Sequence, residues 1–371
     1  MASTGHRQSA STDAAGVTAL LRDASFVHLF GHRNGDALAA TGILGRALDE
    51  LKIPHQVTFA ETPRDCRERQ ATDSTVVGIG FESVGTPLSA KSSMAAAAFE
   101  SASALETDPD PILAMAGVRA AGSEPSDALL QAAREAGAER RPGLGIPTDD
   151  PVTGLAYSTV FHGEFSGSET EAEAFLANLD SDVTNVEAAR RLSSVVALHA
   201  SDGTGADRTQ EAISRGVAPM YVPGPFETAA GYGDVLEALA RADVGLGYRF
   251  VLGYEDRSTA LDTWKRYASD IHDAIEQLDD GDDQEDAIRT VSVSEIDPWT
   301  TARLAKEYRS TAPGVLVTGA EYVALATTQE DAAAWLSDAT DAVAVAGRPD
   351  LAIADRERVD EPVIDRLEEV R

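Results

Sequence analysis

The fold class of this chain is indicated by FVHLFGH (Phe26–His32), which continues through RNGD (Arg33–Asp36) into ALAATGILGRALDEL (Ala37–Leu51). The first part is a short apolar run and predicts a buried strand, whereas the last part has the spacing of an apolar helix. Two more apolar runs follow, HQVTFAE (His55–Glu61) and STVVGIGF (Ser74–Phe81). Strand, helix, strand and strand with short connections are typical of a parallel sheet in an α/β fold.

Helices are predicted for the segments that follow this sheet. SSMAAAAFESASALE (Ser92–Glu106) reads as a helix of small residues, and PILAMAGVRAAG (Pro111–Gly122) as a second buried helix. From residue 126 to about 243 the pattern is mostly helical, with loops expected at Arg141–Pro151 and Ser201–Thr209.

A second, smaller α/β domain is expected at the C-terminal end. The stretch DIHDAIEQLDDGDDQED (Asp270–Asp286) reads as an amphipathic helix that runs into an acidic break, which indicates an interdomain linker. Beyond it, two helices (PWTTARLAKEYRS and QEDAAAWLSDAT) interrupt strands expected at residues 287–296, 314–320, 321–327, 342–349 and 350–357. We therefore predict an α/β fold with a disordered tail (1–16), a parallel-sheet domain (17–268), a linker (269–286) and a C-terminal domain (287–371).

The composition is that of a globular protein adapted to high salt. The 371 residues include 62 Asp and Glu against 31 Lys and Arg, for a formal charge of −31, and 43% of the residues are hydrophobic. Only four of the basic residues are lysines. Lysine scarcity and acidic residues along the whole chain favour adaptation to molar intracellular salt over repulsion of nucleic acid. At molar salt the Debye length falls to about 3 Å, so the bulk charge does not exclude a DNA ligand.

The sequence has no feature of a membrane or exported protein. No stretch approaches the roughly 20 apolar residues of a membrane span, and the N-terminus has no apolar signal core. The single cysteine, Cys66, excludes an intrachain disulfide framework and a cysteine-based metal site. We expect a cytoplasmic protein without a membrane partner.

His32, Asn34 and Asp36 form the candidate site. Their alternating spacing at the C-terminal tip of the first predicted strand lies where open α/β sheets bind ligands. All three side chains could point into that crevice. The alternative is a tight Asn-Gly turn in which Asp36 caps the following helix.

This site resembles the first motif of the DHH phosphoesterase superfamily, and most closely that of the RecJ-like single-strand exonucleases and their archaeal relatives. Their pattern is His-x-Asp-x-Asp-Gly, and here His32-x-Asn34-x-Asp36 precedes a small-residue helix. The two helices after the sheet resemble those that follow the superfamily's DHH loop. GPFETAAGYGDVLEALAR (Gly224–Arg241) resembles a glycine-rich segment and helix of the archaeal members, and AVAVAGRPDLAIADR resembles the strand pair of the DHH-associated C-terminal domain.

The resemblance implies a site for two manganese ions, but the chain departs from the motifs at most ligand positions. Asn34 stands where the first-motif aspartate belongs, and Val77–Gly80 holds no carboxylate where a second-motif aspartate would end the strand. The next acid is Glu82, and the namesake Asp-His-His is absent. We interpret His32, Asn34 and Asp36, with Glu82, as a vestigial metal site without a cofactor. If the site is active, His32 and Asp36 are its catalytic residues and manganese is its metal.

Nucleic-acid contact is expected at Arg356 and Arg348. Arg356 stands where the resemblance places a Ser-x-Arg that touches the substrate backbone, and Arg348 precedes it in a predicted turn. Arginine suits phosphate contacts, and solvated surface arginines are the alternative. His162 and His199, at the ends of apolar runs, are predicted to be structural.

Three functions follow from these observations. The first is a catalytically degenerate RecJ-like subunit of DNA replication or repair, which by resemblance associates with GINS and MCM and binds single-stranded DNA. The second is an active metal-dependent phosphoesterase or single-strand-specific 5′ exonuclease that rebuilds a one-metal site from His32, Asp36 and Glu82. The third is a small-molecule sensor that admits a phosphate or nucleotide at the helix N-terminus beside Asp36.

Overall fold

The chain divides into two compact units. The computed structural model describes residues 14–69, 74–88, 93–177, 186–201, 213–217, 219–278, 288–328, 331–339 and 345–359. Unit 1 consists of Met1–Glu139 and Met220–Trp264, and unit 2 of Arg140–Pro219 and Lys265–Arg371. Among the described helices, none combines the length and the apolar character that crossing a bilayer requires.

Unit 1 is built on a four-stranded sheet. Its strands are β1 (Val27–His32), β2 (His55–Ala60), β3 (Thr75–Ile79) and β4 (Thr86–Leu88). Their order is β2-β1-β3-β4, and every neighbouring pair is parallel, as predicted. Val27 is in register with both His55 and Thr75, so the three strands end at the same edge of the sheet.

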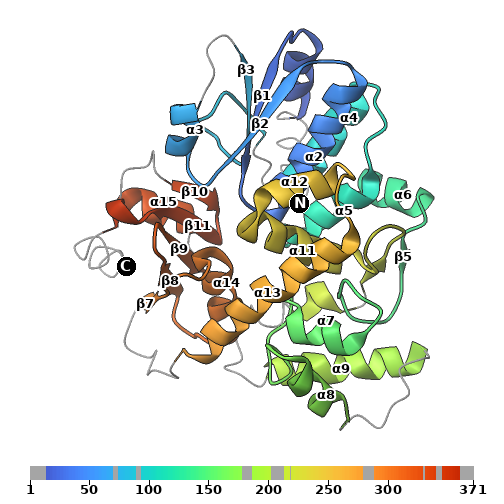
Figure 1. Cartoon of the computed structure of the whole chain (residues 1–371), viewed down its shortest axis with the longest axis vertical. Helices are drawn as coiled ribbons and strands as arrows, with labels where there is room; N and C mark the ends of the chain where they lie inside the picture. The colour runs from blue at the N-terminus through green and yellow to red at the C-terminus, as the bar shows by residue number, and fades with distance from the viewer. Residues whose placement is uncertain are drawn as a thin grey trace, which may run out of the picture. The chain divides into compact units, whose positions relative to one another are not determined.

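Helices cover both faces of this sheet, with α3 on one side and α2 and α4 on the other (Figure 1). The helices of unit 1 after β1 are α2 (Gly35–Glu50), α3 (Pro63–Arg69), α4 (Met94–Ala104), α5 (Pro111–Ala120), α6 (Asp127–Glu135), α11 (Ala229–Ala242) and α12 (Val244–Val251). A short strand, β6 (Met220–Tyr221), pairs with β5 (Glu139–Arg140), whose second residue already belongs to unit 2. Local sequence explains where several of the helices begin. α5 begins at Pro111 after Asp110, whose carboxylate accepts from the N–H groups of Ile112 and Leu113.

Several elements of unit 1 were not predicted, α3 and β4 among them, and a helix begins inside the predicted tail. α3 carries five charged residues among its seven and buries only Pro63 and Cys66, so it has no apolar period to recognise. β4 is three residues long. Residues 14–16 belong to a helix that runs to residue 22, whereas we predicted a disordered tail through residue 16. Ala14 is buried there, and its carbonyl accepts from the hydroxyls of Thr18 and Ser101.

The helical part of unit 2 surrounds an aromatic core. Its helices are α7 (Pro151–Tyr157), α8 (Glu169–Ala177), α9 (Val186–Ser201) and α13 (Arg257–Glu276), the last of which crosses the unit boundary. Phe161, Phe165 and Phe175 fill the core. The hydroxyl of Tyr267 in α13 contacts Asp297 at 2.8 Å and the hydroxyl of Thr300 at 2.5 Å, at the N-terminus of the next helix.

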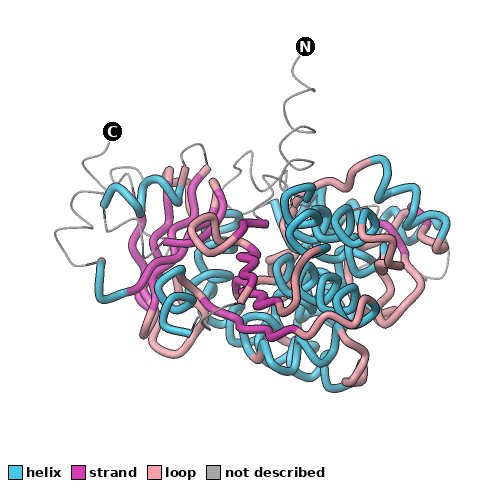
Figure 2. The backbone as a smooth tube through the Cα atoms, turned by 90° about the horizontal axis from the view of Figure 1, so that it is seen from above, coloured by secondary structure: helices cyan, strands magenta, loops and turns pink. Residues whose placement is uncertain are grey.

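The C-terminal part of unit 2 is a five-stranded mixed sheet, drawn with its strands in magenta in Figure 2. Its elements are β7 (Ile288–Ser292), α14 (Pro298–Tyr308), β8 (Gly314–Thr318), β9 (Tyr322–Thr327), α15 (Ala332–Ala339), β10 (Val345–Arg348), β11 (Leu351–Asp355) and the 3-10 helix η2 (Arg356–Arg358). The strand order is β10-β11-β9-β8-β7, in which only β7 and β8 are parallel. Leu316 and Leu325 pack with Leu336 of α15 on one face, and α14 covers the other.

The predicted domain boundaries remain predictions. The two units divide the chain within α13, and residues 140–219 belong to the unit that holds the C-terminal sheet. Of the predicted linker (269–286), residues 269–276 continue α13, and residues 279–286 lie outside the described part of the chain. The predicted loop at 201–209 also lies outside it, except for Ser201 at the end of α9.

Candidate functional site

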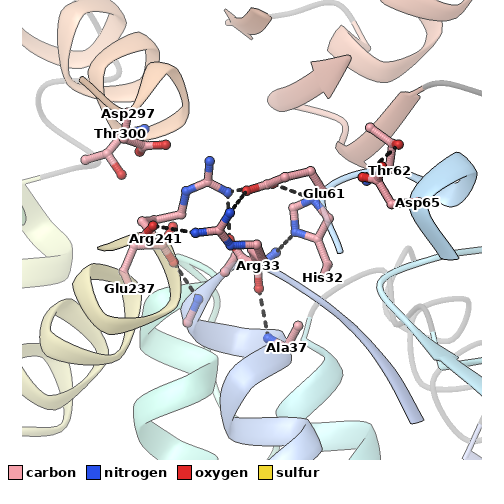
Figure 3. Close-up of polar contacts among 12 residues, drawn as sticks. His32, Arg33, Ala37, Glu61, Thr62, Asp65, Glu237, Arg241, Asp297 and Thr300 are labelled. Atoms are coloured by element: carbon pink, nitrogen blue, oxygen red, sulfur yellow. Dashed lines mark hydrogen bonds and ion pairs between the residues drawn. The ribbon is translucent and has the colours of Figure 1, made fainter. Parts of the chain in front are cut away.

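The carboxyl ends of the central strands meet at one edge of the parallel sheet. β1 ends at His32, and the next residue, Arg33, donates its backbone N–H to the carbonyl of Ala60 at the end of β2. Glu61 follows β2 directly. Figure 3 shows the side chains of Arg33 and Arg241 reaching Glu61 at this edge.

His32 is a buried and neutral histidine. Its side chain is 1% exposed, and its ring meets the ring of Phe81 edge-on at a centroid distance of 5.5 Å. Burial, together with the positive charges of Arg241 and Arg33, lowers the pKa of His32 to about 3, and a hydrogen bond with the backbone of Glu61 opposes this shift only in part. The imidazole therefore carries no charge at neutral pH.

Asn34 determines which ring nitrogen of His32 carries the proton. Its Oδ1 accepts from the N–H of Ala37 at 2.8 Å and caps α2, so its Nδ2 is the end that faces His32. Nδ2 donates to Nδ1 of His32 at 2.8 Å, which places the ring proton on Nε2. A neutral imidazole binds a metal through its unprotonated nitrogen, and in His32 Asn34 occupies that nitrogen.

Asp36 is buried and anchors the N-terminus of α4. Its Oδ1 accepts from the hydroxyl of Ser93 at 2.7 Å and from the N–H of Ala95 at 2.8 Å, and its Oδ2 accepts from the N–H of Met94 at 2.7 Å. The first N–H groups of a helix have no partner inside the helix, so a carboxylate there is stabilised. The alternative interpretation of Asp36 as a cap is correct in its chemistry but names the wrong helix, because Asn34 caps α2.

A buried ionic network closes the edge of the sheet. Arg241 of α11 donates from Nη1 to Oε2 of Glu61 at 2.9 Å and to the carbonyl of Arg33 at 2.7 Å. In return Arg33 donates from Nη2 to the carbonyl of Arg241 at 2.7 Å, and its Nη1 lies 3.4 Å from Oε1 of Glu61. Both oxygens of Glu61 therefore face guanidinium groups.

Glu237 occupies the N-terminus of α2. It lies one turn before Arg241 on α11, and its Oε2 accepts from the N–H of Gly35 at 2.6 Å. A Cβ on Gly35 would lie 2.8 Å from the backbone nitrogen of Glu237, so only glycine lets α11 approach this closely. The helix terminus that we proposed for a phosphate or nucleotide thus already binds a carboxylate of the chain.

The end of β3 supplies no second carboxylate. Gly80 follows β3 with a φ of +86°, and a Cβ there would lie 3.0 Å from the Cβ of His32 and from the Sδ of Met94. Glu82 lies in an exposed turn before β4, whereas Asp36 is buried. Within the described ranges, no group of three or more His, Cys, Asp or Glu side chains is arranged to hold a metal ion.

The residues at this edge do not fit the two manganese ions that the DHH resemblance implies. Three carboxylates (Asp36, Glu61 and Glu237) and two guanidinium groups leave a formal charge of −1, with His32 neutral. Each carboxylate already accepts hydrogen bonds from protein donors. A pair of dications needs several carboxylate and imidazole ligands with available lone pairs, and these residues do not supply them.

Arg348 and Arg356, the predicted nucleic-acid contacts, both have partners within the chain. Arg348 is the last residue of β10 and not part of a turn, and its Nε lies 2.8 Å from Oδ1 of Asp350. Arg356 opens η2 and donates from Nη1 to the carbonyl of Gly319 at 2.9 Å. Arg356 is exposed, and its role in DNA binding remains a prediction.

Unit 2 contains a buried histidine pair that sequence reasoning missed. His162 and His272 have their Nδ1 atoms 3.1 Å apart and their rings stacked at 17°. Nε2 of His272 lies 3.1 Å from the carbonyl of Ser158, which can only accept, so this nitrogen carries the proton. Nδ1 of His162 is therefore the donor between the two rings. His162 is thus buried and paired with His272, and its purely structural role remains a prediction.

The decisive residues of the network also escaped the sequence analysis. Glu61 ends the second predicted strand, and an acid directly after an apolar strand of an α/β sheet is the signal that could have identified it. Glu237 and Arg241 lie in a helix that we recognised only by resemblance, and no local pattern connects them with the first strand.

Comparison with known proteins identifies the family and the fold. No family model matches the chain. The "Uncharacterized protein rrnAC1427" of Haloarcula marismortui is 36% identical over 347 residues, which cover 92% of each chain. The chain belongs to the family of this haloarchaeal protein. Its source, a halophilic archaeon, agrees with the interpretation of the acidic composition as salt adaptation.

Solved structures similar to this member of the haloarchaeal family have the RecJ-like fold. CDC45 from Entamoeba histolytica matches with a TM-score of 0.54 at 9% identity over 98% of both chains. RecJ in complex with Mn2+ from Thermus thermophilus matches with a TM-score of 0.53 at 14% identity; the match covers 97% of this chain but only 54% of that RecJ. A manganese-bound exonuclease RecJ has a TM-score of 0.50 at 14% identity, over 97% of this chain and 93% of the other. The fold predicted from the DHH resemblance is confirmed.

Proposed function

We propose that this protein is a catalytically inactive RecJ-like subunit of DNA replication or repair in the cytoplasm of a halophilic archaeon. The observation that carries the proposal is the state of the three buried carboxylates at the sheet edge. Arg241 binds Glu61, the N-terminus of α4 binds Asp36, and the N-terminus of α2 binds Glu237. None of these oxygens is arranged to activate a water molecule with a metal. The protein keeps the scaffold and binds partners instead.

The fold neighbours support both halves of this proposal. RecJ is an exonuclease in one of the similar structures, and CDC45 matches over nearly its whole length. By the DHH resemblance, we propose GINS and MCM as protein partners and single-stranded DNA as a further ligand. Arg356, with Arg348, is the proposed contact to the DNA backbone, because a guanidinium group suits phosphate oxygens.

The activity test is manganese-dependent degradation of 5′-labelled single-stranded DNA in molar KCl. Wild type and Asp36→Asn are purified in parallel, and circular dichroism shows that both are folded. We expect no degradation by either protein, and equal traces in both would identify a contaminating nuclease. Degradation by wild type that the variant lacks would overturn the proposal in favour of an active 5′ exonuclease.

The partner test uses purified GINS and MCM of the same organism. We expect co-elution in molar KCl on a sizing column, and separate elution of all components would contradict the partner assignment. DNA binding is measured as fluorescence anisotropy over a salt series. Arg356→Ala should reduce the slope of log K against log salt by about 0.7 if this side chain neutralises one phosphate of a single strand. An unchanged slope removes Arg356 from the interface.

A further inference from the structure

We infer that the guanidinium group of Arg241 is the built-in cation of the sheet edge and stands where a divalent metal ion would need to bind Glu61. The inference deepens the proposed function, on which it rests, by naming the group that closes the ancestral site. Arg241 and Glu61 are 180 residues apart in the chain, and both side chains are 3% exposed. A carboxylate and a guanidinium buried this deeply are stable only as a pair.

The contacts of Arg241 are those of a group that joins two segments. One Nη1 atom binds both Oε2 of Glu61 after β2 and the carbonyl of Arg33 after β1. Both segments follow the carboxyl end of a strand, where polar groups of parallel sheets are exposed to ligands. Arg241 satisfies a carboxylate and a carbonyl oxygen at once, which are the oxygen ligands that a hard cation also prefers.

Arg33 completes the closure from the opposite direction. It donates to the carbonyl of Arg241 at 2.7 Å, close to the C-terminal end of α11, where helix carbonyls lack partners and positive charge is favourable. The two arginines therefore exchange hydrogen bonds between side chain and backbone in both directions. Arg33 is 31% exposed, so solvent reaches the network from its side only in part.

α11 is thus held to the β1–α2 turn at two points without a metal. Arg241 binds the turn through Arg33, and Glu237, one turn earlier, binds the N–H of Gly35. A metal ion at Glu61 would have to displace Arg241, which would leave a buried guanidinium without its carboxylate. The same arrangement explains why His32 has no role as a ligand: Asn34 holds its unprotonated nitrogen.

The test is a double-mutant cycle read by thermal unfolding in molar KCl. Glu61→Gln and Arg241→Gln each leave one buried charge without its partner, so each should lower the unfolding midpoint. The double variant contains two neutral amides, so its unfolding midpoint should fall by clearly less than the sum of the decreases in the two single variants. Arg249→Gln is the matched control, because Arg249 of α12 is exposed and pairs with Glu255, which follows that helix.

Manganese binding is measured on the same proteins by the electron paramagnetic resonance of free Mn2+. We expect no saturable Mn2+ binding by wild type. In Arg241→Gln the carboxylate of Glu61 is released, so the thermal unfolding midpoint of this variant should rise with Mn2+. The double variant should not respond. If Arg241→Gln does not fold, recovery of folding in the double variant supports the inference and failure of both overturns it.

Two outcomes overturn the inference: additive losses in the cycle, or saturable Mn2+ binding by wild type that Glu61→Gln abolishes. These outcomes are distinguishable from failure of the proposed function. Wild type that binds Mn2+ without degrading DNA contradicts only the role of Arg241. Wild type that also degrades DNA in a manganese-dependent manner contradicts both.

Discussion

At the scale of single residues, Gly80 is a position where a side chain would disturb the surroundings of His32. It combines a φ of +86° with contacts of 3.0 Å from a built Cβ to His32 and Met94. Any side chain here adds backbone strain and crowds the buried imidazole. An aspartate at this position, which would add a carboxylate at the end of β3, would press against the side chains of His32 and Met94.

We expect Gly80→Ala to lower the free energy of unfolding by about 2–3 kcal/mol, measured by urea unfolding in molar KCl. Gly253→Ala is the matched control. Gly253 has a similar φ of +83°, but a Cβ there would meet nothing within 4 Å. The free energy of unfolding of Gly253→Ala should therefore fall only by the backbone strain of about 1 kcal/mol. Equal losses in the two variants would show that the contact with His32 and Met94 is unimportant.

At the scale of elements, the helices of unit 1 pack through small residues. A Cβ on Gly117 of α5 would lie 2.4 Å from the Cβ of Ala95 in α4 and 2.8 Å from the Cβ of Ala39 in α2. Backbones that approach this closely leave no space for one methyl group. The Ala- and Gly-rich helices of the sequence are therefore a packing requirement and not only a compositional bias.

Gly117→Ala should lower the free energy of unfolding by about 1–3 kcal/mol, because α5 must move away from two helices. Gly245→Ala in α12 is the control within a helix, since its closest neighbour is Oδ1 of Asp243 at 3.4 Å. There the higher helix propensity of alanine should raise stability by up to about 1 kcal/mol. Urea unfolding curves of both variants test this; the same sign for both would refute the packing argument.

The contact between α13 and the segment before α8 makes unit 2 sensitive to acid. Burial, the neighbouring His272 and Arg309 lower the pKa of His162 to about 3, and burial and Arg303 lower the pKa of His272 to about 4. The unfolded chain protonates both near pH 6.5. Below that pH the unfolded state binds protons that the folded state does not, so stability falls as the pH falls toward the folded pKa values.

The expected loss is about 1.4 kcal/mol per pH unit for each buried histidine between about pH 6 and pH 4.5, with His32 of unit 1 adding to the total. Urea unfolding across this range measures the slope. His272→Gln keeps an amide donor for the carbonyl of Ser158 but removes one titrating group. In this variant the free energy of unfolding should fall less steeply with pH, by about 1.4 kcal/mol per pH unit, because one proton fewer is taken up on unfolding. A pH slope equal to that of wild type would contradict a lowered pKa of His272.

At the scale of the whole molecule, a formal charge of −31 dominates the response to salt. Repulsion among acidic surface residues opposes the compact state, and counterions at molar concentration screen it within about 3 Å. The ion pair of Arg241 with Glu61 is buried, so salt screens it far less.

The thermal unfolding midpoint should therefore rise continuously as KCl increases from about 0.1 M to several molar. NaCl should act similarly, because screening depends on ionic strength and not on the particular cation. Sucrose at matched osmolality serves as the uncharged control and should produce a much smaller rise. A midpoint that is independent of KCl would refute salt adaptation as the cause of the acidic composition.

Residue types and their spacing were enough to predict the alternation of strand and helix, the parallel sheet and the absence of an acidic residue at position 34 and at residues 77–80. These are properties of residue type and local spacing, because apolar periodicity reports which face of an element is buried. Only the three-dimensional arrangement shows which charged groups meet at the carboxyl ends of the strands. Arg241 lies 180 residues from Glu61, and Glu237 lies 202 residues from Gly35. Periodicity shows that α11 is buried but not against which turn, and a buried charge is satisfied by whichever partner packing brings within hydrogen-bond distance.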